Sequence, residues 1–410
     1  MRTLAVYLHE ERVGELEQRD EGSLRFTYSP EWLSRENATP LSRMLPLTPE
    51  TFEAGHTRPF FAGVLPEAGP RRRIAEVLGI SERNDFAMLE RIGGECAGAV
   101  SLHPSDEEPR QIERRVRALE AEELEAIVKT LPDRPLLAGE EGIRLSLAGA
   151  QEKLPVVVDG DSVSLPLGNT PSTHILKPEP ERFPGLVANE FFCMKLAEAA
   201  GLPVAGVTQR KIGGKPCLLV ERYDREQRDD GTTLRLHQED FCQALGYAPE
   251  RKYQQEGGPH VRECLALLRE WSSTPVLDIR DFVDALIFNY LTGNADAHGK
   301  NYSMIYRGTE RRLAPLYDIV STIAWPQLSK RLAMNIGQCE NVNDVNPGHF
   351  RRLAKEASLG WPMVRDRIES LTSKVMEKLS TGSLIAESPD HGMATRVSEL
   401  AAERCRRMLS

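Results

Sequence analysis

The stretch Phe288–Ser321, FNYLTGNADAHGKNYSMIYRGTERRLAPLYDIVS, decides how this chain is organised. It opens on the end of an apolar helix and continues through a polar loop, residues 293–301, that holds Asp, His, Lys and two Asn. Alternating residues then predict a hairpin, with a strand at Tyr302–Tyr306, a turn at Arg307–Glu310 and a return strand ending at Leu316-Tyr317-Asp318. A loop this rich in reactive groups, held between a helix and a hairpin, indicates a functional site.

Three oxygen-bearing side chains in this stretch, Asp296, Asn301 and Asp318, follow the order used in protein-kinase-like phosphoryl transfer. That chemistry needs a carboxylate near the attacking hydroxyl and hard oxygen ligands for Mg²⁺ on the phosphates. Asp296 suits the first role, and Asn301 and Asp318 suit the second. A plain polar loop, whose Asn and Asp side chains bind their own backbone, is the alternative. The full cluster with the later Tyr-Asp favours the site.

Composition limits the class of protein. A chain of 410 residues exceeds a single core and predicts two or three domains. Its 40% hydrophobic and 28% charged residues are typical of soluble globular proteins, and the net charge of −9 argues against broad nucleic-acid binding. No apolar run approaches the ~20 residues of a membrane span. The N-terminus lacks a signal-peptide core, and seven scattered cysteines predict reduced thiols, so we expect a cytoplasmic protein.

Residues 1–105 predict a small α+β domain. Strands are expected at Leu4–Leu8, Val13–Leu16 and Ser23–Tyr28, followed by two short helices in Phe60–Gly79 that are broken by Pro66 and by Gly69-Pro70. The following residues, 106–139, are expected to form a connector that contains an amphipathic helix at Leu119–Thr130.

From residue 140 the pattern changes to a strand at 143–147, a tight loop at Ala148–Lys153 and a returning strand at Leu154–Val158. Such a loop can fold over nucleotide phosphates, although the stretch taken alone favours a plain hairpin. A strand at Ser172–Pro178 then carries Lys177, and a helix at Leu186–Ala200 carries Glu190. Kinases hold a cation on the phosphates with such a pair. The alternative is a solvated strand-end lysine and a glutamate favoured by the helix dipole.

The C-terminal half is predominantly helical after a strand at Leu218–Glu221, a possible hinge at Arg222–Arg225 and a surface loop at 227–236. Asp240 and Asp281 are expected to begin helices. The remaining expected elements are helices at Glu239–Leu245, Val261–Trp271, Ile279–Leu291, Pro347–Ala357, Trp361–Ser380 and Met393–Met408, a strand at Met334–Ile336, and a break at Ser380–His391.

Several of these segments together resemble one family, the HipA-type serine/threonine kinases, which are the toxin halves of bacterial toxin–antitoxin pairs. The resemblance covers the chain from about residue 1 to about residue 375, and the combination of AGAQEK with NxDxHxKN is highly specific. The matching segments are Phe60–Glu67, Ile92–Val100, Arg144–Lys153 (RLSLAGAQEK), His174–Pro178 (HILKP), Val220–Arg225 (VERYDR), His237–Gln243 (HQEDFCQ), Asn294–Ser303 (NADAHGKNYS) and Leu316–Thr322 (LYDIVST).

This resemblance implies an α+β fold that is two-lobed and protein-kinase-like, with a β-rich N-lobe and a helical C-lobe. A small α+β N-terminal subdomain would precede the lobes. The expected boundaries are 1–105 for the subdomain, 106–139 for the connector, 140–224 for the N-lobe and 225–410 for the C-lobe.

Carried over residue by residue, the resemblance makes Asp296 the catalytic base and Asn301 and Asp318 the Mg²⁺ ligands. Ser146 matches the family's autophosphorylation site, where a phosphate adds ~2 negative charges, expels the loop and inactivates the enzyme. The residues implied in ATP binding are Ala148, Gly149, Ala150, Gln151, Glu152 and Lys153 over the phosphates, Lys177 on the phosphates, the backbone of Glu221 to Tyr223 at the adenine, and His298 and Lys300 in the loop. For His298, loop shaping by hydrogen bonds is favoured over proton transfer.

The resemblance also implies partners. A helix-turn-helix antitoxin (HipB-like) would bring the chain to DNA indirectly, and the protein substrate would be an aminoacyl-tRNA synthetase, glutamyl-tRNA synthetase above all. The consequence would be growth arrest or persistence, with no membrane involved. Two alternatives stay open: a catalytically reduced co-repressor that holds the antitoxin on its operator, and a kinase of the same build that acts on a small molecule. Retention of Lys177 together with Asp296, Asn301 and Asp318 favours the active protein kinase.

Overall fold

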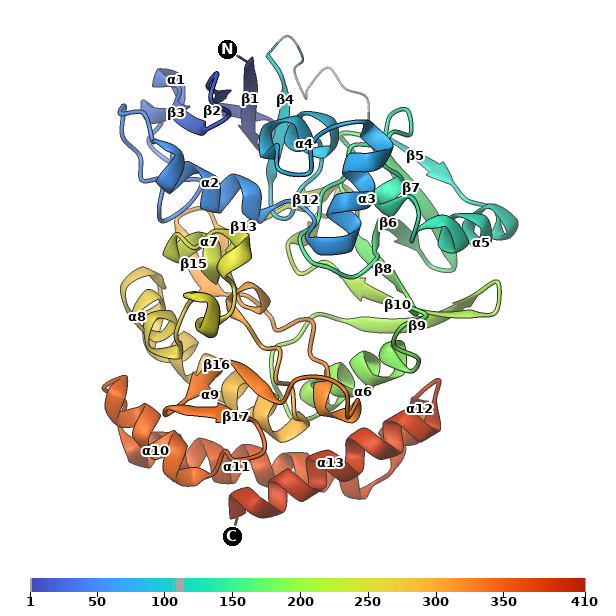
Figure 1. Ribbon diagram of the computed structural model, residues 1–410, viewed down its shortest axis with the longest axis vertical. Helices are drawn as coiled ribbons and strands as arrows, with labels where there is room; N and C mark the ends of the chain where they lie inside the picture. The colour runs from blue at the N-terminus through green and yellow to red at the C-terminus, as the bar shows by residue number, and fades with distance from the viewer. Residues whose placement is uncertain (1, 106, 108–113, 410) are drawn as a thin grey trace. The chain divides into compact units, whose positions relative to one another are not determined.

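The computed structural model describes residues 2–105, 107 and 114–409, which form two compact units (Figure 1). Each unit is assembled from separate stretches of chain. The first comprises Met1–Pro178, Arg210–Glu250 and Ile305–Glu310, and the second comprises Glu179–Gln209, Arg251–Met304 and Arg311–Ser410. The chain passes between the two units several times, and the domain boundaries expected from the sequence stay a prediction.

The first unit begins with an antiparallel sheet in the order β3-β2-β1-β4. Its strands are β1 (Arg2–Leu8), β2 (Glu11–Gln18), β3 (Leu24–Tyr28) and β4 (Val100–Pro104), and its helices are α1 (Pro30–Leu33), α2 (Ala54–Gly63), α3 (Ala68–Leu78) and α4 (Asp85–Ile92). The predicted strands and the helix break at Pro66 are confirmed. The second predicted break was wrong, because Gly69-Pro70 lies in the first turn of α3, where proline's missing N–H has no partner to lose.

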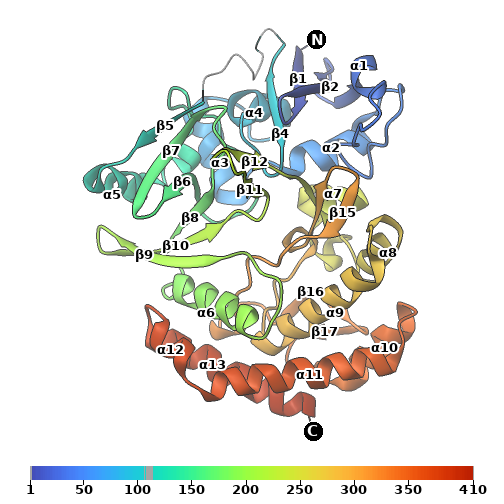
Figure 2. The ribbon, with the colours of Figure 1, turned by 180° about the vertical axis from the view of Figure 1, so that it is seen from behind.

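A second sheet of the same unit has the order β5-β7-β6-β8-β10-β9 (Figure 2). Its strands are β5 (Arg114–Ala118), β6 (Leu154–Asp159), β7 (Ser162–Gly168), β8 (His174–Pro178), β9 (Val207–Ile212) and β10 (Lys215–Glu221), accompanied by α5 (Ala121–Thr130) and a 3₁₀ turn at Pro135–Leu137. The predicted hairpin of 143–147 with 154–158 was wrong. Residue Leu145 instead forms a parallel bridge with Glu95, and β6 pairs with β7 and β8.

Two further predictions in this unit need correction. The expected surface loop at 227–236 is a small hairpin of β11 (Arg225–Gln227) and β12 (Thr233–Arg235). The segment expected to start a helix at Glu239 is first a strand, β13 (His237–Asp240), which joins β14 (Ser303–Arg307) and β15 (Glu310–Leu313) in a three-stranded sheet. Helix α7 (Phe241–Leu245) then starts at Asp240, whose predicted capping role is confirmed by a capping box with Gln243.

Strand β13 carries a buried carboxyl, Glu239, that joins the N-terminal segment to β14. Glu239 accepts hydrogen bonds from Ser42 Oγ at 2.6 Å, from Arg43 N at 3.1 Å and from the Tyr306 hydroxyl. Its full burial raises its pKa from about 4.5 to about 7, against the hydrogen bonds, and the neighbouring Asp240 adds to the rise.

We expect Glu239→Gln to remove a pH dependence of folding. Between pH 4.5 and 7 the native protein holds a proton on Glu239 that the unfolded chain has lost, so the wild-type free energy of unfolding falls as pH rises. The fall is roughly 3 kcal/mol for a shift of this size. Glutamine keeps the contacts, because its amide can donate to Ser42 Oγ. Urea unfolding at pH 5 and pH 8 measures the difference, with exposed Glu36→Gln as control. If the free energy of unfolding falls equally from pH 5 to pH 8 in Glu239→Gln and Glu36→Gln, Glu239 is not the source of the pH dependence.

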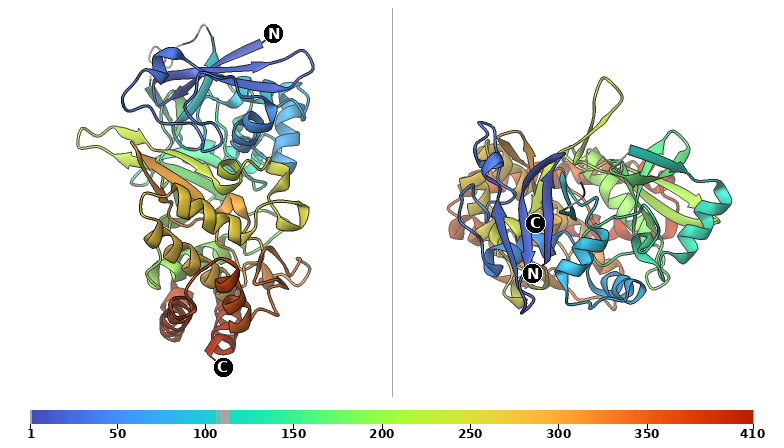
Figure 3. Two further views of the ribbon diagram at one scale, coloured as in Figure 1. Left: turned by 90° about the vertical axis from the view of Figure 1, so that its left-hand side faces the viewer. Right: turned by 90° about the horizontal axis from the view of Figure 1, so that it is seen from above.

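The second unit is mainly helical, and α9 (Pro275–Thr292) packs against α8 (Val261–Trp271), α11 (Trp361–Ser380) and α13 (His391–Leu409) (Figure 3). Its other elements are α6 (Leu186–Ala199), α10 (Pro347–Glu356), α12 (Ser383–Glu387), β16 (Arg331–Ile336) and β17 (Cys339–Asn341). Most predicted helices are confirmed. Asp281 does not begin α9, which starts two turns earlier after Thr274, and α12 lies in the predicted break.

Three chemical properties bear on function. All seven cysteines are free and buried. Across residues 2–105, 107 and 114–409, no group of three or more His, Cys, Asp or Glu side chains is arranged to hold a metal ion. None of the helices in that part of the chain combines the length and apolar character of a membrane-spanning segment.

Candidate active site

The polar loop begins at Gly293, which ends α9 in the left-handed conformation with φ of 72°. A side chain there would be excluded, since a Cβ would lie 2.2 Å from Ile323 Cδ1. The next residue, Asn294, donates from Nδ2 to Asn289 Oδ1 on α9 at 2.8 Å and accepts from Asp296 N at 3.0 Å. Asn294 therefore binds backbone, as the plain-loop alternative expected, and in doing so it aims Asp296.

The rest of the loop is held from inside and outside. Inside it, His298 N donates to Asp296 O at 2.8 Å, and Asn301 N donates to His298 O at 2.9 Å, which forms the 3₁₀ turn Gly299–Asn301. Residues outside the loop hold the backbone of Ala295 at two points. Its N–H donates to Thr322 Oγ1 at 2.9 Å, and its carbonyl accepts from Ala333 N on β16 at 2.8 Å. A loop restrained this way keeps its side chains in fixed positions.

Asp296 is exposed to solvent, unlike most of the loop around it. Its Oδ1 accepts a hydrogen bond of 2.8 Å from the hydroxyl of Tyr253, whose ring also stands edge-on to His298 at 5.3 Å. Tyr253 was missed in the sequence analysis because it lies 43 residues before Asp296, outside any motif. A single tyrosine before a short 3₁₀ turn at Gln254–Glu256 gives no signal by itself.

Asn301 and Asp318, 17 residues apart, are joined through their neighbours. The Tyr317 hydroxyl donates to the Lys300 carbonyl at 2.7 Å and contacts Ser303 Oγ at 2.7 Å. Asn301 follows Lys300 in the sequence and Asp318 follows Tyr317, so the hydrogen bond between Tyr317 and Lys300 joins the backbone next to both predicted metal ligands. Asp318 adopts the left-handed conformation with φ of 58°, which aspartate tolerates better than most residues.

The residues expected on the nucleotide side lie in the first unit. Lys177 is 6% exposed on β8, opposite Leu218 of β10. In the loop after residue 147, Lys153 Nζ donates to Ala148 O at 2.7 Å, and Gly149 has φ of 110°, a conformation that favours glycine. Ala150 is exposed, and Gln151 and Glu152 are half-buried. This loop is closed on itself by its own lysine.

Ser146 precedes that loop and is fully buried, with 0% exposure. Its hydroxyl donates to Val64 O at 2.9 Å, and its N–H donates to Glu95 O at 2.8 Å. A phosphate on Ser146 would have to break the first bond, because the hydroxyl would lose its hydrogen and gain bulk and charge.

The expected hinge follows β10. Glu221 is exposed at the strand's end, and Tyr223 is half-buried with its hydroxyl on Gln238 Oε1 at 2.7 Å. Arg222 between them is buried, and its N–H donates to Thr173 O at 3.0 Å. The predicted partner of Lys177, Glu190, is 1% exposed on α6 in the second unit, and the pairing stays a prediction.

Comparison with known proteins identifies relatives along almost the whole chain. The family model described as HipA N-terminal domain matches residues 4–103, and the HipA-like C-terminal domain matches residues 145–380. The chain is 46% identical over 384 residues to "Putative kinase Y4mE" of Sinorhizobium fredii, covering 93% of this chain and 91% of that one. It is 31% identical over 428 residues to the serine/threonine-protein kinase toxin HipA of Shewanella oneidensis, covering 99% and 96%.

A solved structure gives the same result. The Shewanella oneidensis HipA, determined with HipB and its operator DNA, matches with a TM-score of 0.87 at 28% identity, covering 99% of this chain and 97% of that one. These matches define the class of protein as a kinase and confirm the predicted α+β fold class. The chain belongs to the HipA family, since the C-terminal model alone spans more than half of it.

A kinase of this family implies a nucleoside triphosphate and its metal ion, and the donor set fits both. Asn301 Nδ2 is directed at Asp296 O, 3.4 Å away, which turns the amide oxygen away from that carbonyl. An amide oxygen and a carboxylate suit Mg²⁺, which takes few protein ligands and completes its shell with phosphate oxygens and water.

Proposed function

We propose that this chain is an Mg-ATP-dependent serine/threonine protein kinase that acts as the toxin of a toxin–antitoxin pair. The observation that carries the proposal is the restrained loop in which exposed Asp296 is aimed by Asn294 and Tyr253, with Asn301 and Asp318 linked through Tyr317. A structural loop has no need of an exposed carboxylate that is held by a tyrosine hydroxyl.

In the proposed reaction Asp296 accepts the proton of the attacking serine or threonine hydroxyl. The Tyr253 hydroxyl holds one carboxylate oxygen, so the other is directed to the acceptor. Asn301 and Asp318 would hold Mg²⁺, which neutralises charge on the phosphates when it is bound.

On the nucleotide side Lys177 would contact the phosphates, and the loop Ala148–Lys153 would cover them. Lys153 is half-buried, and its ammonium group donates a hydrogen bond to Ala148 O. It could exchange this carbonyl for a phosphate oxygen, which supports the proposal that the loop reorganises around a nucleotide. The backbone of Glu221 to Tyr223 would hold the adenine. His298 and Lys300 would stabilise the polar loop 293–301, which carries Asp296.

The biological role rests on relatives. A HipB-like helix-turn-helix antitoxin is the proposed partner, supported by the Shewanella oneidensis HipA determined with HipB and operator DNA. Through it the chain would contact DNA indirectly. The proposed substrate is an aminoacyl-tRNA synthetase, glutamyl-tRNA synthetase first, and its phosphorylation in the cytoplasm would cause growth arrest or persistence.

The same solved complex favours a second candidate, a co-repressor that holds the antitoxin on its operator without catalysis. The two candidates differ in what they require of Mg-ATP. A small-molecule kinase of the same build would transfer the γ-phosphoryl group of ATP to a metabolite in place of a protein.

Intact-mass measurement after incubation with Mg-ATP tests the proposal. The wild-type protein should gain one phosphate, and peptide mapping should locate it on Ser146. The Ser146→Ala variant should gain none at that position and stay active on a protein substrate, because it lacks the inactivating phosphate. A wild-type protein that binds no ATP and gains no mass would favour the co-repressor. ATP turnover without any phosphoprotein in a bacterial lysate would favour the small-molecule kinase.

A further inference from the structure

The turn after α4, which contains Glu95, touches two distant parts of the first unit. Its backbone forms an isolated parallel bridge with the segment 144–146, which precedes the proposed phosphate loop: Glu95 N donates to Arg144 O at 2.8 Å, and Ser146 N donates to Glu95 O at 2.8 Å. Glycine at position 94 permits this approach, since a Cβ there would lie 2.8 Å from Arg144 Cβ.

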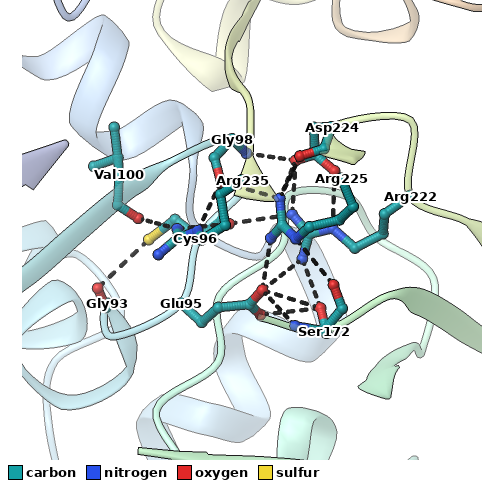
Figure 4. Close-up of polar contacts among 10 residues, drawn as sticks. All are labelled: Gly93, Glu95, Cys96, Gly98, Val100, Ser172, Arg222, Asp224, Arg225 and Arg235. Carbon is teal, nitrogen blue, oxygen red and sulfur yellow. Dashed lines mark hydrogen bonds and ion pairs between the residues drawn. The ribbon is translucent and has the colours of Figure 1, made fainter. Parts of the chain in front are cut away.

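The side chain of Glu95 points the other way, to the residues that follow β10 (Figure 4). Its Oε1 accepts from Arg222 at 3.1 Å and from Arg225 at 2.6 Å. Ser172 closes the third side: its Oγ lies 3.0 and 3.2 Å from the two carboxylate oxygens, and its N–H donates to Oε1 at 3.1 Å. Glu95 is 3% exposed, so none of these contacts is exchanged for water.

A second acid completes the cluster. Asp224 accepts from Arg222 Nε at 3.0 Å and Nη2 at 2.8 Å, and from Gly98 N at 2.6 Å. Arg235 donates to the carbonyls of the same turn, at 3.1 Å to Gly98 and 2.6 Å to Val100. Burial opposes ionisation of both acids, but the arginines outweigh it and hold the pKa of Glu95 and of Asp224 below the ordinary values.

Such a cluster is stable only as a complete set, because one unpaired charge in a dry site is costly. Arg222 lies inside the expected hinge, Arg222–Arg225, and the anchors of its guanidinium are buried: Glu95, Asp224, Ser172 and the carbonyl of Cys96. Of the two acids, Asp224 moves with the hinge, whereas Glu95 comes from a turn more than a hundred residues earlier. Glu95 is thus the acid that can set the hinge's position.

We propose that Glu95 is a positioning residue for nucleotide recognition, which fixes the hinge backbone relative to the segment 144–146 that precedes the proposed phosphate loop. The inference rests on the proposed function in one respect, the assignment of the Glu221 to Tyr223 backbone to the adenine. Its consequence is that the N-terminal α+β subdomain is part of the apparatus that selects adenine.

Comparison of ATP with inosine triphosphate tests the proposal, because inosine lacks the 6-amino donor that a hinge carbonyl would accept. Wild type should prefer ATP in kcat/KM by about tenfold, the effect of one hydrogen bond of ordinary strength. Glu95→Gln keeps the size of the side chain and both backbone bonds, but it leaves Arg222 and Arg225 to share one acid. We expect the preference to fall to about twofold, with a raised KM for ATP and kcat largely retained.

The chain offers a matched control in Asp85, which also lies buried between two arginines of the first unit, Arg58 at 2.8 Å and Arg71 at 2.6 Å. Asp85→Asn should lower the melting temperature and leave the ATP preference at its wild-type value. Should Glu95→Gln fail to fold, Ser172→Ala removes a milder contact of the same carboxylate and should lower the preference to about fourfold.

The outcomes separate this inference from the proposed function. If the Glu95→Gln protein folds and still prefers ATP to inosine triphosphate tenfold, Glu95 has no positioning role. The same conclusion follows if Asp85→Asn lowers the ATP preference as much as Glu95→Gln does. A wild type that phosphorylates with ATP and inosine triphosphate equally well overturns the adenine assignment and this inference with it. A wild type without Mg-ATP activity overturns the proposed function itself.

Discussion

Asp296→Asn is expected to slow phosphate incorporation by roughly 10²–10⁴-fold, the range for loss of a general base. Asparagine keeps the shape of the side chain and can still accept the Tyr253 hydroxyl hydrogen bond at its amide oxygen, so the loop should fold unchanged. Its amide cannot accept the proton of an attacking hydroxyl. Because Asp296 acts on the acceptor in the proposed reaction, the affinity for a fluorescent ATP analogue should stay within about twofold of wild type.

The measurement is the initial rate of phosphate incorporation by intact mass, paired with a nucleotide titration of the same preparation. Asp366→Asn on α11 is the control: this aspartate is exposed and pairs with the neighbouring exposed Arg365, so both rate and affinity should be unchanged. A variant at position 296 with wild-type rate would remove Asp296 from the reaction.

The largest effect on stability is expected at Arg222, which is 5% exposed and serves both acids of the buried cluster. Arg222→Met preserves most of the volume but leaves Glu95 and Asp224 with fewer cationic partners in a dry site. Breaking a buried charge set this way costs about 3–5 kcal/mol. Both carboxyls should then take up protons more readily, since the arginine no longer lowers their pKa. The loss of stability should therefore be smaller at pH 5 than at pH 8.

Urea unfolding at the two pH values measures both parts of this prediction. Arg365→Met on α11 is the control, because that arginine is 54% exposed, and exposed ion pairs contribute about 0–1 kcal/mol. If Arg222→Met and Arg365→Met destabilise the protein equally, the buried charges of Glu95, Asp224 and Arg222 do not depend on one another for stability.

Helices and the site loop could be predicted from the sequence because their signals are local. The 3.6-residue spacing of apolar side chains located α6, α8 and α11, and the spacing from Asp296 to Asn301 lies within a single loop. The strand errors have one cause. Residues 143–147 look like a strand in isolation, but their backbone partner is Glu95, and no local pattern names a partner about fifty residues away.

The same distinction separates the site residues that were predicted from those that were missed. Asp296, Asn301, Asp318 and Lys177 belong to short motifs whose chemistry is visible along the chain. Tyr253 and Glu95 act only through contacts made by folding, at sequence separations of 43 and 127 to 130 residues. The predicted pairing of Glu190 with Lys177 would likewise be a contact made only by folding, and it rests on analogy with other kinases.

The three-stranded sheet of β13, β14 and β15 has a consequence for synthesis of the protein on the ribosome. Its strand β13 ends at residue 240, but its partner β14 does not begin until residue 303, and the Tyr306 hydroxyl completes the shell of Glu239. A nascent chain that stops before residue 303 therefore exposes an unpaired strand edge and a half-satisfied buried acid. We therefore expect the N-terminal portion to complete its folding only after the polar loop 293–301 has been translated, so a product that terminates earlier should be a target for proteolysis.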